Sequence, residues 1–291
     1  MAQGAIYSLS DTICYENLKS SATNYGHQRF FGAIGWGSFA ILTGFLNSLA
    51  NDDLNRCYTP GFYLMVVLSA FLILNTHHID MKLSSHKIID AKPKNLYVSK
   101  EFLCFEVCIL ASGMLTAYTS CYMIWYIENL GGSQLLGGFA LSIQCLLGEA
   151  LFMYFSESLI STFGHWNIVT ASFLTFAVRY YGYYMLNNPW FILPLEVLHG
   201  ITYGLFYSTM TSYAKEIAPA GSEATVQGIF SGTFQGLGTG FGSFVAGTSI
   251  DAYGGRISFL IAAIFSTLAA LVSSLFSFIV KDSKPVLIEM K

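Results

Sequence analysis

The stretch PWFILPLEVLHGITYGLFYS, residues 189–208, is almost wholly apolar and yet contains Glu196 and His199, three residues apart. A helix that spans a bilayer needs about 20 mostly apolar residues. An ion left unpaired at mid-bilayer depth costs about 2.5–3.5 kcal/mol or more. The stretch is therefore either the core of a soluble protein or a membrane helix that turns its polar pair towards a protected interior.

The composition of the whole chain decides between these alternatives. Of its 291 residues, 54% are hydrophobic and 11% are charged, whereas about 25% of the residues in a typical soluble domain are charged. Long apolar blocks span a bilayer as helices, because a helix satisfies its own backbone hydrogen bonds. The sequence therefore predicts an all-α integral membrane protein with about eight transmembrane helices. The blocks lie at 30–50, 60–78, 102–126, 133–155, 166–186, 189–213, 224–250 and 256–280.

The basic residues predict how these helices are oriented. Eight spans leave both termini on one side of the membrane, and that side holds eleven Lys and Arg residues against two on the other. Cytosolic loops carry an excess of Lys and Arg, so we expect cytosolic termini in a multi-pass protein of the plasma membrane. The predicted divisions are a cytosolic segment 1–29, two spans within 30–78, a cytosolic loop 79–101, a six-span half-bundle 102–280 and a cytosolic tail 281–291.

Several classes of function are not expected from this sequence. The six cysteines form no CxxC pair and show no ligand spacing with histidine, so no metal site is predicted. The net charge of −3 gives no reason to expect a nucleic-acid partner. The chain contains no HExxH, GxSxG or paired-aspartate pattern, so we do not expect an enzyme. Oligomeric state is not predicted.

Four charged or titratable residues lie deep inside the predicted spans: Glu149, Arg179, Glu196 and His199. Each belongs to a stripe of polar residues at three- and four-residue steps, so each can face the interior of a bundle. Arginine keeps its proton, so Arg179 should hold at least one carboxylate ionised. We expect the four residues to form a proton-coupling network. The alternative is a buried ion pair, Arg179 with Glu149 or Glu196, that only fixes helix packing.

Within 189–208 the polar residues share one face of the helix. Glu196 and His199 lie about 60° apart around it, because each residue advances the helix by about 100°. Tyr203 and Tyr207 follow on the same face. Glu196 is expected to carry the coupled proton, and His199, which titrates near neutral pH, is expected to tune it or to contact the substrate.

Two further patterns concern packing. Glu106 lies near the start of the third block and is expected to snorkel to the membrane interface. In block 224–250, glycines recur in steps of four residues and should let another helix approach closely. This stripe comprises Gly228, Gly232, Gly236 and Gly240, with Gly238 and Gly242 on a neighbouring line.

Three stretches carry a resemblance to a known family: YGHQRFFGAIGWGSFA (25–40), LLGEALFMYFSESLISTFGHWNIV (146–169) and LHGITYGLF (198–206). They resemble the fifth, eighth and tenth spans of the major facilitator superfamily, in its lactose-permease-like and nucleoside–proton symporter branch. LEVLHGITYGLF and ATVQGIFSGTFQGLG are also similar to the animal major-facilitator-associated-domain proteins. The resemblance covers spans five to twelve of a twelve-span family, so the chain is expected to lack the first four spans.

The resemblance implies roles for particular residues. Arg29 and Trp36 fall on a sugar-binding arginine and a stacking tryptophan, and Tyr203 is expected to join them at the substrate. Glu149, Arg179 and His199 fall on the acidic residue, the arginine and the histidine of spans eight, nine and ten. Thr202 stands where lactose permease has its proton-coupling glutamate, so lactose is not implied as the substrate.

The function expected is secondary, proton-coupled transport of a small polar solute that resembles a sugar or a nucleoside. The partners would be this solute, protons and the lipid bilayer, with no cofactor besides the proton gradient. Two alternatives stay open: a non-transporting membrane receptor or interaction protein on the same fold, and an inactive truncated transporter.

Overall fold

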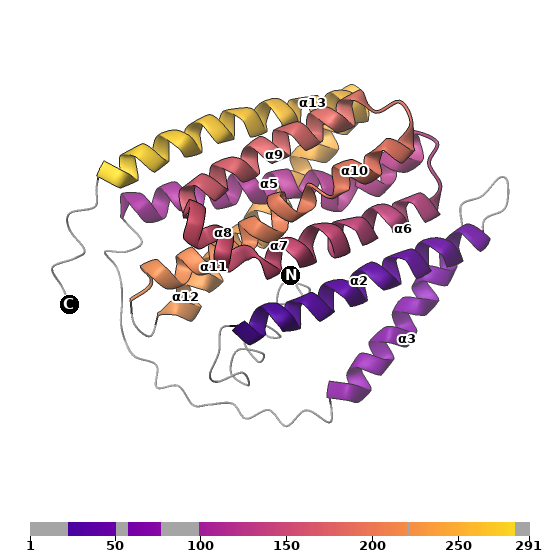
Figure 1. Cartoon of the computed structure of the whole chain (residues 1–291). Helices are drawn as coiled ribbons and strands as arrows, with labels where there is room; N and C mark the ends of the chain where they lie inside the picture. Colours follow the sequence, from indigo (N-terminus) through magenta and orange to yellow (C-terminus); the bar gives the residue numbers. More distant parts are fainter. Residues whose placement is uncertain (1–22, 51–57, 77–98, 220–221, 283–291) are drawn as a thin grey trace.

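The computed structural model describes residues 23–50, 58–76, 99–219 and 222–282, and this part of the chain is helical throughout, without a strand (Figure 1). The predicted all-α architecture is confirmed. Most of the predicted cytosolic segments 1–29, 79–101 and 281–291 lies outside the described residues. The helices are α2 (Thr23–Leu49), α3 (Thr59–Thr76), α5 (Lys100–Asn129), α6 (Gln134–Ile143), α7 (Leu151–Tyr154), α8 (Ser156–Phe163), α9 (His165–Met185), α10 (Ile192–Glu196), α11 (Phe206–Ile217), α12 (Glu223–Ser231) and α13 (Thr239–Asp282).

Three of the predicted spans contain a segment of π-helix, whose turns are wider by about one residue than those of an α-helix. These segments are η1 (Gln144–Ala150), η3 (Gly200–Leu205) and η4 (Gly232–Gly238). A short 3₁₀ turn, η2 (Pro189–Phe191), precedes α10. Each π segment is continuous with the α-helices before or after it, and each lies in a block that hydropathy alone marks as a plain helix.

By length and composition, three helices in the described part of the chain could cross a membrane: Lys100–Asn129, Gln134–Tyr154 and Thr225–Ile279. The last contains two predicted blocks, 224–250 and 256–280. They are joined through Gly254, whose φ of +79° breaks the helical backbone inside α13. Glycine adopts this left-handed conformation without steric cost, so the chain can turn there. The remaining apolar blocks also form helices.

Local sequence signals mark where several helices begin. The hydroxyl of Ser99 accepts a hydrogen bond from the backbone N–H of Phe102 at 3.2 Å, which caps α5. Ser133 caps α6 in the same way through the N–H of Leu136. Such caps satisfy backbone donors that the first turn leaves free. Gly164, with φ of +77°, separates α8 from α9.

The core of the bundle lies between α5, α9 and α13, which run side by side in Figure 1. It is built from aromatic rings that are fully buried. Phe259 of α13 packs against Tyr126 of α5 and Tyr183 of α9, with ring centroids 4.8 and 5.0 Å apart. The Tyr126 hydroxyl donates to the carbonyl of Tyr183 at 2.8 Å. These contacts fix the height of α9 relative to α5.

The first two described helices attach to the bundle through α2. A side chain at Gly138 of α6 would place its Cβ 2.7 Å from the carbonyl oxygen of Ala40, and one at Gly44 would come 2.9 Å from that of Gln134. Only glycine therefore allows α2 and α6 to approach this closely. Figure 1 shows α3 leaning away from the rest of the bundle, beyond α2.

Among the described residues, no helix packs closely on the glycine stripe of block 224–250. A Cβ at Gly228, or at the other three stripe positions, would find no atom within 4 Å. The close contact runs along the neighbouring line instead. A Cβ at Gly242 would come 2.5 Å from Met114, and one at Gly113 would come 2.4 Å from the carbonyl oxygen of Phe234. The wide turns of η4 lie within this stripe and change which face of the helix meets α5.

We predict that Gly113→Ala destabilises the protein, because the added methyl group must displace backbone rather than a flexible side chain. Overpacking of this kind costs about 1–3 kcal/mol. Thermal unfolding of the purified chain in detergent, followed by tryptophan fluorescence, should show a lower Tm. Gly228→Ala is the matched control and should leave Tm unchanged or slightly higher. An equal fall in both variants would contradict the assigned contact.

Candidate functional site

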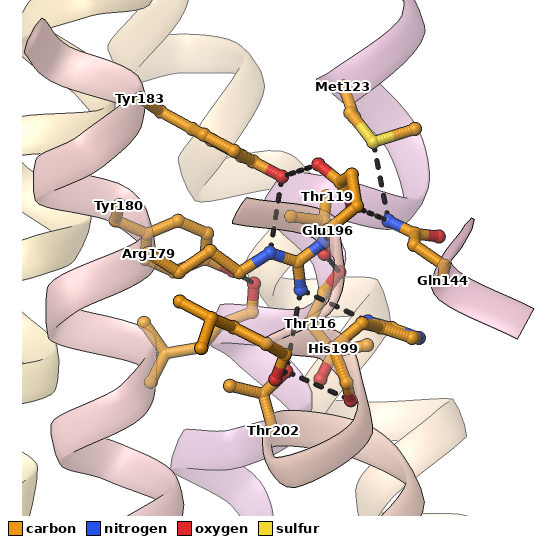
Figure 2. A network of polar contacts seen from close by, with 12 residues as sticks. Thr116, Thr119, Met123, Gln144, Arg179, Tyr180, Tyr183, Glu196, His199 and Thr202 are labelled. Atoms are coloured by element: carbon orange, nitrogen blue, oxygen red, sulfur yellow. Dashed lines mark hydrogen bonds and ion pairs between the residues drawn. The ribbon is translucent and has the colours of Figure 1, made fainter. Parts of the chain in front are cut away.

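A buried ion pair between Arg179 and Glu196 lies at the centre of the polar residues inside the bundle (Figure 2). Arg179 comes from α9, and Glu196 is the last residue of α10. Nη2 of the arginine lies 2.5 Å from Oε2 of the glutamate, and neither side chain has any exposed surface. Of the two carboxylates that the sequence offers to Arg179, the structure pairs it with Glu196.

The carboxylate of Glu196 receives two more hydrogen bonds. The Tyr183 hydroxyl donates to Oε1 and the Gln144 amide donates to Oε2. Gln144 belongs to η1 and also lies 3.3 Å from the sulfur of Met123 on α5. Elements from three parts of the chain thus converge on one carboxylate, and its oxygens are satisfied without water.

Arg179 has three further partners besides Glu196. Its Nε donates to the Tyr183 hydroxyl at 3.2 Å, and its Nη1 lies 3.0 Å from Nδ1 of His199 and 3.4 Å from the hydroxyl of Thr202. A guanidinium group has no acceptor, so Nδ1 of His199 must accept. The imidazole is therefore neutral in this arrangement, with its hydrogen on Nε2.

The helix that carries Glu196 and His199 is irregular at this level because it packs backbone to backbone against its neighbour. A Cβ at Gly200 in η3 would lie 2.6 Å from the carbonyl oxygen of Gly148 in η1, and one at Gly204 would lie 3.2 Å from the backbone of Glu149. Glycines at these positions bring η1 and η3 together. Two π segments meet where Gln144 reaches Glu196, and π segments are frequent at functional sites.

An aromatic stack continues from this network along the same helix. The ring of Tyr203 stacks on His199 with centroids 5.2 Å apart and planes inclined by 6°. Tyr207 stacks on Tyr203 at 5.8 Å and 21°. The spacing of four residues gives this near-parallel stack because the wide turn of η3 brings such residues closer to one line. Tyr203 remains partly exposed.

Two other predicted site residues, Glu149 and Trp36, do not bond to the ion pair in the described part of the chain. Glu149 is on η1 and is partly buried, but it is not among the partners of Arg179. Trp36 lies on α2 with 53% of its surface exposed. Arg29 belongs to α2, and its side chain lies outside the described part of the chain.

Sequence reasoning gave no role to Gln144, Tyr183 or Thr202, which complete the shell of the ion pair. Tyr183 lies four residues after Arg179, so the two side chains share one face of the helix, which is a usable signal. Gln144 lies five residues before Glu149, so a regular α-helix would not place the two on one face, and the π segment η1 begins at this residue. A buried amide within an apolar block is the signal that could have found it.

Comparison with known proteins shows which family has this sequence and architecture. The sequence profile described as MFS_1 like family matches residues 1–261. A maltose permease of Geobacillus stearothermophilus is 26% identical over 86% of this chain and 62% of its own length. A protein of Escherichia coli strain K12 whose name includes the words nucleoside transporter is 22% identical over 84% of this chain and 59% of its own.

An animal relative matches over a shorter range. The mouse major facilitator superfamily domain-containing protein 6-like is 28% identical over 46% of this chain and 22% of its own length. The chain thus spans less than two thirds of the length of each of these three relatives. The named relatives are not enzymes, which agrees with the expectation from sequence motifs. The resemblance found in the sequence is confirmed, and this multi-pass membrane chain belongs to the MFS_1 like family within the major facilitator superfamily.

Proposed function

We propose that this chain serves secondary, proton-coupled transport of a small polar solute that resembles a sugar or a nucleoside. The observation that supports the proposal is the fully buried Arg179–Glu196 pair, with Tyr183, Gln144 and His199 around it. We further propose a plasma-membrane location, and cytosolic termini, the latter because the basic residues lie mainly on that side.

The energetics favour a functional role over a purely structural one. Burying two ions costs several kcal/mol each before their attraction is counted, and hydrophobic residues of similar volume often replace such a pair at no loss of stability. A pair kept only for packing would therefore be replaceable. In a pair that must open and re-form, the charges act as the switch: protonating Glu196 removes the anion that holds Arg179, and deprotonating it restores the pair.

The proposed coupling between proton binding and solute binding follows from this opening and closing of the Arg179–Glu196 pair. When Glu196 takes a proton, Arg179 loses its charge partner and is left with Tyr183, His199 and Thr202. A polar solute can then offer oxygen acceptors to the guanidinium group, and its departure returns Arg179 to Glu196. His199 accepts from Arg179 at 3.0 Å, so it senses whether the arginine is engaged. Glu149, on the neighbouring segment η1, is the second candidate proton carrier.

The aromatic stack supports a solute that contains a ring. Tyr203 presents a partly exposed ring next to His199 and hence next to Arg179. Flat faces of sugars and nucleobases pack on aromatic rings, and a nearby guanidinium group can bind their polar edge. The names of the bacterial relatives, a maltose permease and a protein named as a nucleoside transporter, fit this choice. Arg29 and Trp36 are proposed to complete the substrate site.

Binding and uptake measurements separate the three hypotheses. A library of sugars and nucleosides is first screened for thermal stabilisation of the purified chain, because Arg179, Glu196, His199 and Tyr203 all lie in its described part. Uptake by proteoliposomes is then measured with and without an imposed pH gradient. A receptor binds without uptake in any version. A transporter takes up solute, and an imposed pH gradient increases its uptake. An inactive truncated transporter shows neither binding nor uptake as the present chain, and gains both when four further spans precede it in the same chain.

We predict that Glu196→Gln keeps solute exchange and loses accumulation driven by the pH gradient, because the amide fills the same space and cannot exchange a proton. Exchange and accumulation are measured in the same proteoliposomes, using the chain as given or the chain preceded by four further spans, whichever takes up solute. Glu157→Gln, which changes an exposed carboxylate on α8, is the control and should accumulate normally. Normal accumulation with normal proton stoichiometry in Glu196→Gln would make the carboxylate structural and shift attention to Glu149.

The pairing itself can be tested by stability alone. Arg179→Gln and Glu196→Gln should each lower the free energy of unfolding by about 3–5 kcal/mol, since each leaves an uncompensated buried charge. The double variant removes both charges and should recover much of this loss. A double-mutant cycle on purified chain in detergent measures the coupling. Additive losses would show that the two charges do not interact.

We predict that Tyr203→Ala weakens binding of the solute by about tenfold, which corresponds to about 1.4 kcal/mol of lost stacking. Tyr203→Phe keeps the ring and should bind within about twofold of the original. Affinity is measured by equilibrium binding with whichever solute the screen identifies. If both variants bind equally well, the aromatic stack belongs to the packing of the helix and not to the solute site.

A further inference from the structure

The carboxyl group of a second acidic residue is buried in the bundle without an ion pair in the described part of the chain. Glu106 of α5 was expected to snorkel to the interface, and the structure contradicts this. Both of its carboxyl oxygens are buried, and neither forms a hydrogen bond within the described part of the chain. Glu196 has the same chemical group, but its oxygens receive three hydrogen bonds. The free-energy cost of burying the carboxyl group must therefore be met differently at Glu106 and at Glu196.

The surroundings of Glu106 are apolar. On α5 itself, Phe102 and Ile109 lie one turn before and one turn after it, and both are buried. Phe102 also packs on Phe230 of α12, with ring centroids 5.3 Å apart. Thr233 of η4 is a polar neighbour of Glu106, and its hydroxyl lies close enough to interact with the carboxyl group, although not in regular hydrogen-bond geometry.

The charged groups on the elements packed around α5 are engaged elsewhere. His165 of α9 lies 3.4 Å from Glu216 of α11, and Arg256 of α13 donates to the carbonyl of Leu186 at 2.6 Å. Arg179 is paired with Glu196. The other titratable or charged side chains described on these elements and on α5 are Lys100, Glu101, Cys104, Cys108, Tyr118, Cys121, Tyr122, Tyr126, Glu128, Tyr180, Tyr181, Tyr183, Tyr184, Tyr203, Tyr207, Tyr213, Lys215, Asp251 and Tyr253. None of them hydrogen-bonds to Glu106 in the described residues.

An ionised carboxylate in such a place would cost several kcal/mol, and a buried group of this kind neutralises instead. We propose that Glu106 is a second proton-binding site, whose carboxyl group holds a proton in this conformation. It is separate from the ion pair. Tyr180, which follows Arg179 on α9, donates to the carbonyl of Leu115 on α5. Leu115 lies nine residues, or about 14 Å, further along α5 than Glu106.

The test reads the proton directly and does not depend on transport. Infrared spectra of the purified chain in lipid at pH 7 should contain the C=O stretching band of a neutral carboxylic acid, above the amide I band. Glu106→Gln should lose this band. Glu157→Gln, the matched control on an exposed carboxylate, should keep it. If the Glu106→Gln spectrum retains the band unchanged, the proposal is overturned.

A second measurement on the original chain covers the case in which Glu106→Gln does not fold. An apolar carbodiimide reacts with a protonated carboxyl group: the proton passes to a nitrogen, the oxygen adds to the central carbon, and an acyl shift leaves a stable N-acylurea. Peptide mass spectrometry at pH 7 should find this adduct on Glu106 and not on Glu196 or Glu157. Absence of the adduct on Glu106, or equal modification by a water-soluble carbodiimide, would overturn the proposal. Either result leaves the proposed role of Glu196 untouched.

Discussion

The charge on Arg179 is the constraint around which the interior of this bundle is arranged. A guanidinium group cannot shed its proton, and no water reaches this one, since its side chain has no exposed surface. An anion must therefore lie beside it, and Glu196 meets that need at 2.5 Å. Tyr183 and Gln144 then satisfy the remaining oxygens of the carboxylate. The positions of α9, α10 and η1 follow from one charge that cannot be neutralised.

Backbone contacts between glycines set the heights at which these groups meet. Gly148 and Gly200 bring η1 against η3, and Gly113 and Gly238 bring α5 against η4. In apolar surroundings helices gain little from burying apolar surface against each other, so close backbone approach supplies much of the packing energy. Each of these contacts involves a π segment. The same wide turns that bring the backbones together also rotate Gln144 towards Glu196 and align His199 with Tyr203.

Hydropathy and charge were enough to predict the helices and the residues that are costly to bury. Each apolar block became a helix, and Arg179 with Glu196 was one of the two pairs that the sequence offered. The π segments could not be predicted, because one extra residue in a turn leaves hydropathy unchanged while it alters every face beyond it. Gln144 was missed for this reason, and the glycines at Gly228 and its stripe were assigned to the wrong contact. Glu106 was misjudged because snorkelling depends on which neighbours cover the side chain.

Glu106 and Glu196 show that burial alone does not decide the state of a carboxyl group. Glu196 is surrounded by donors, among them a fixed positive charge, and every one of these bonds favours the ionised form. Glu106 has aromatic and aliphatic neighbours and forms no ion pair in the described part of the chain, so little repays the loss of its hydration. Changing the state of Glu196 requires that Arg179 move to other partners. Changing the state of Glu106 requires only that water or a cation reach its carboxyl group. The two proposed proton-binding sites therefore depend on different neighbours: a fixed guanidinium group at Glu196, and mainly apolar side chains at Glu106.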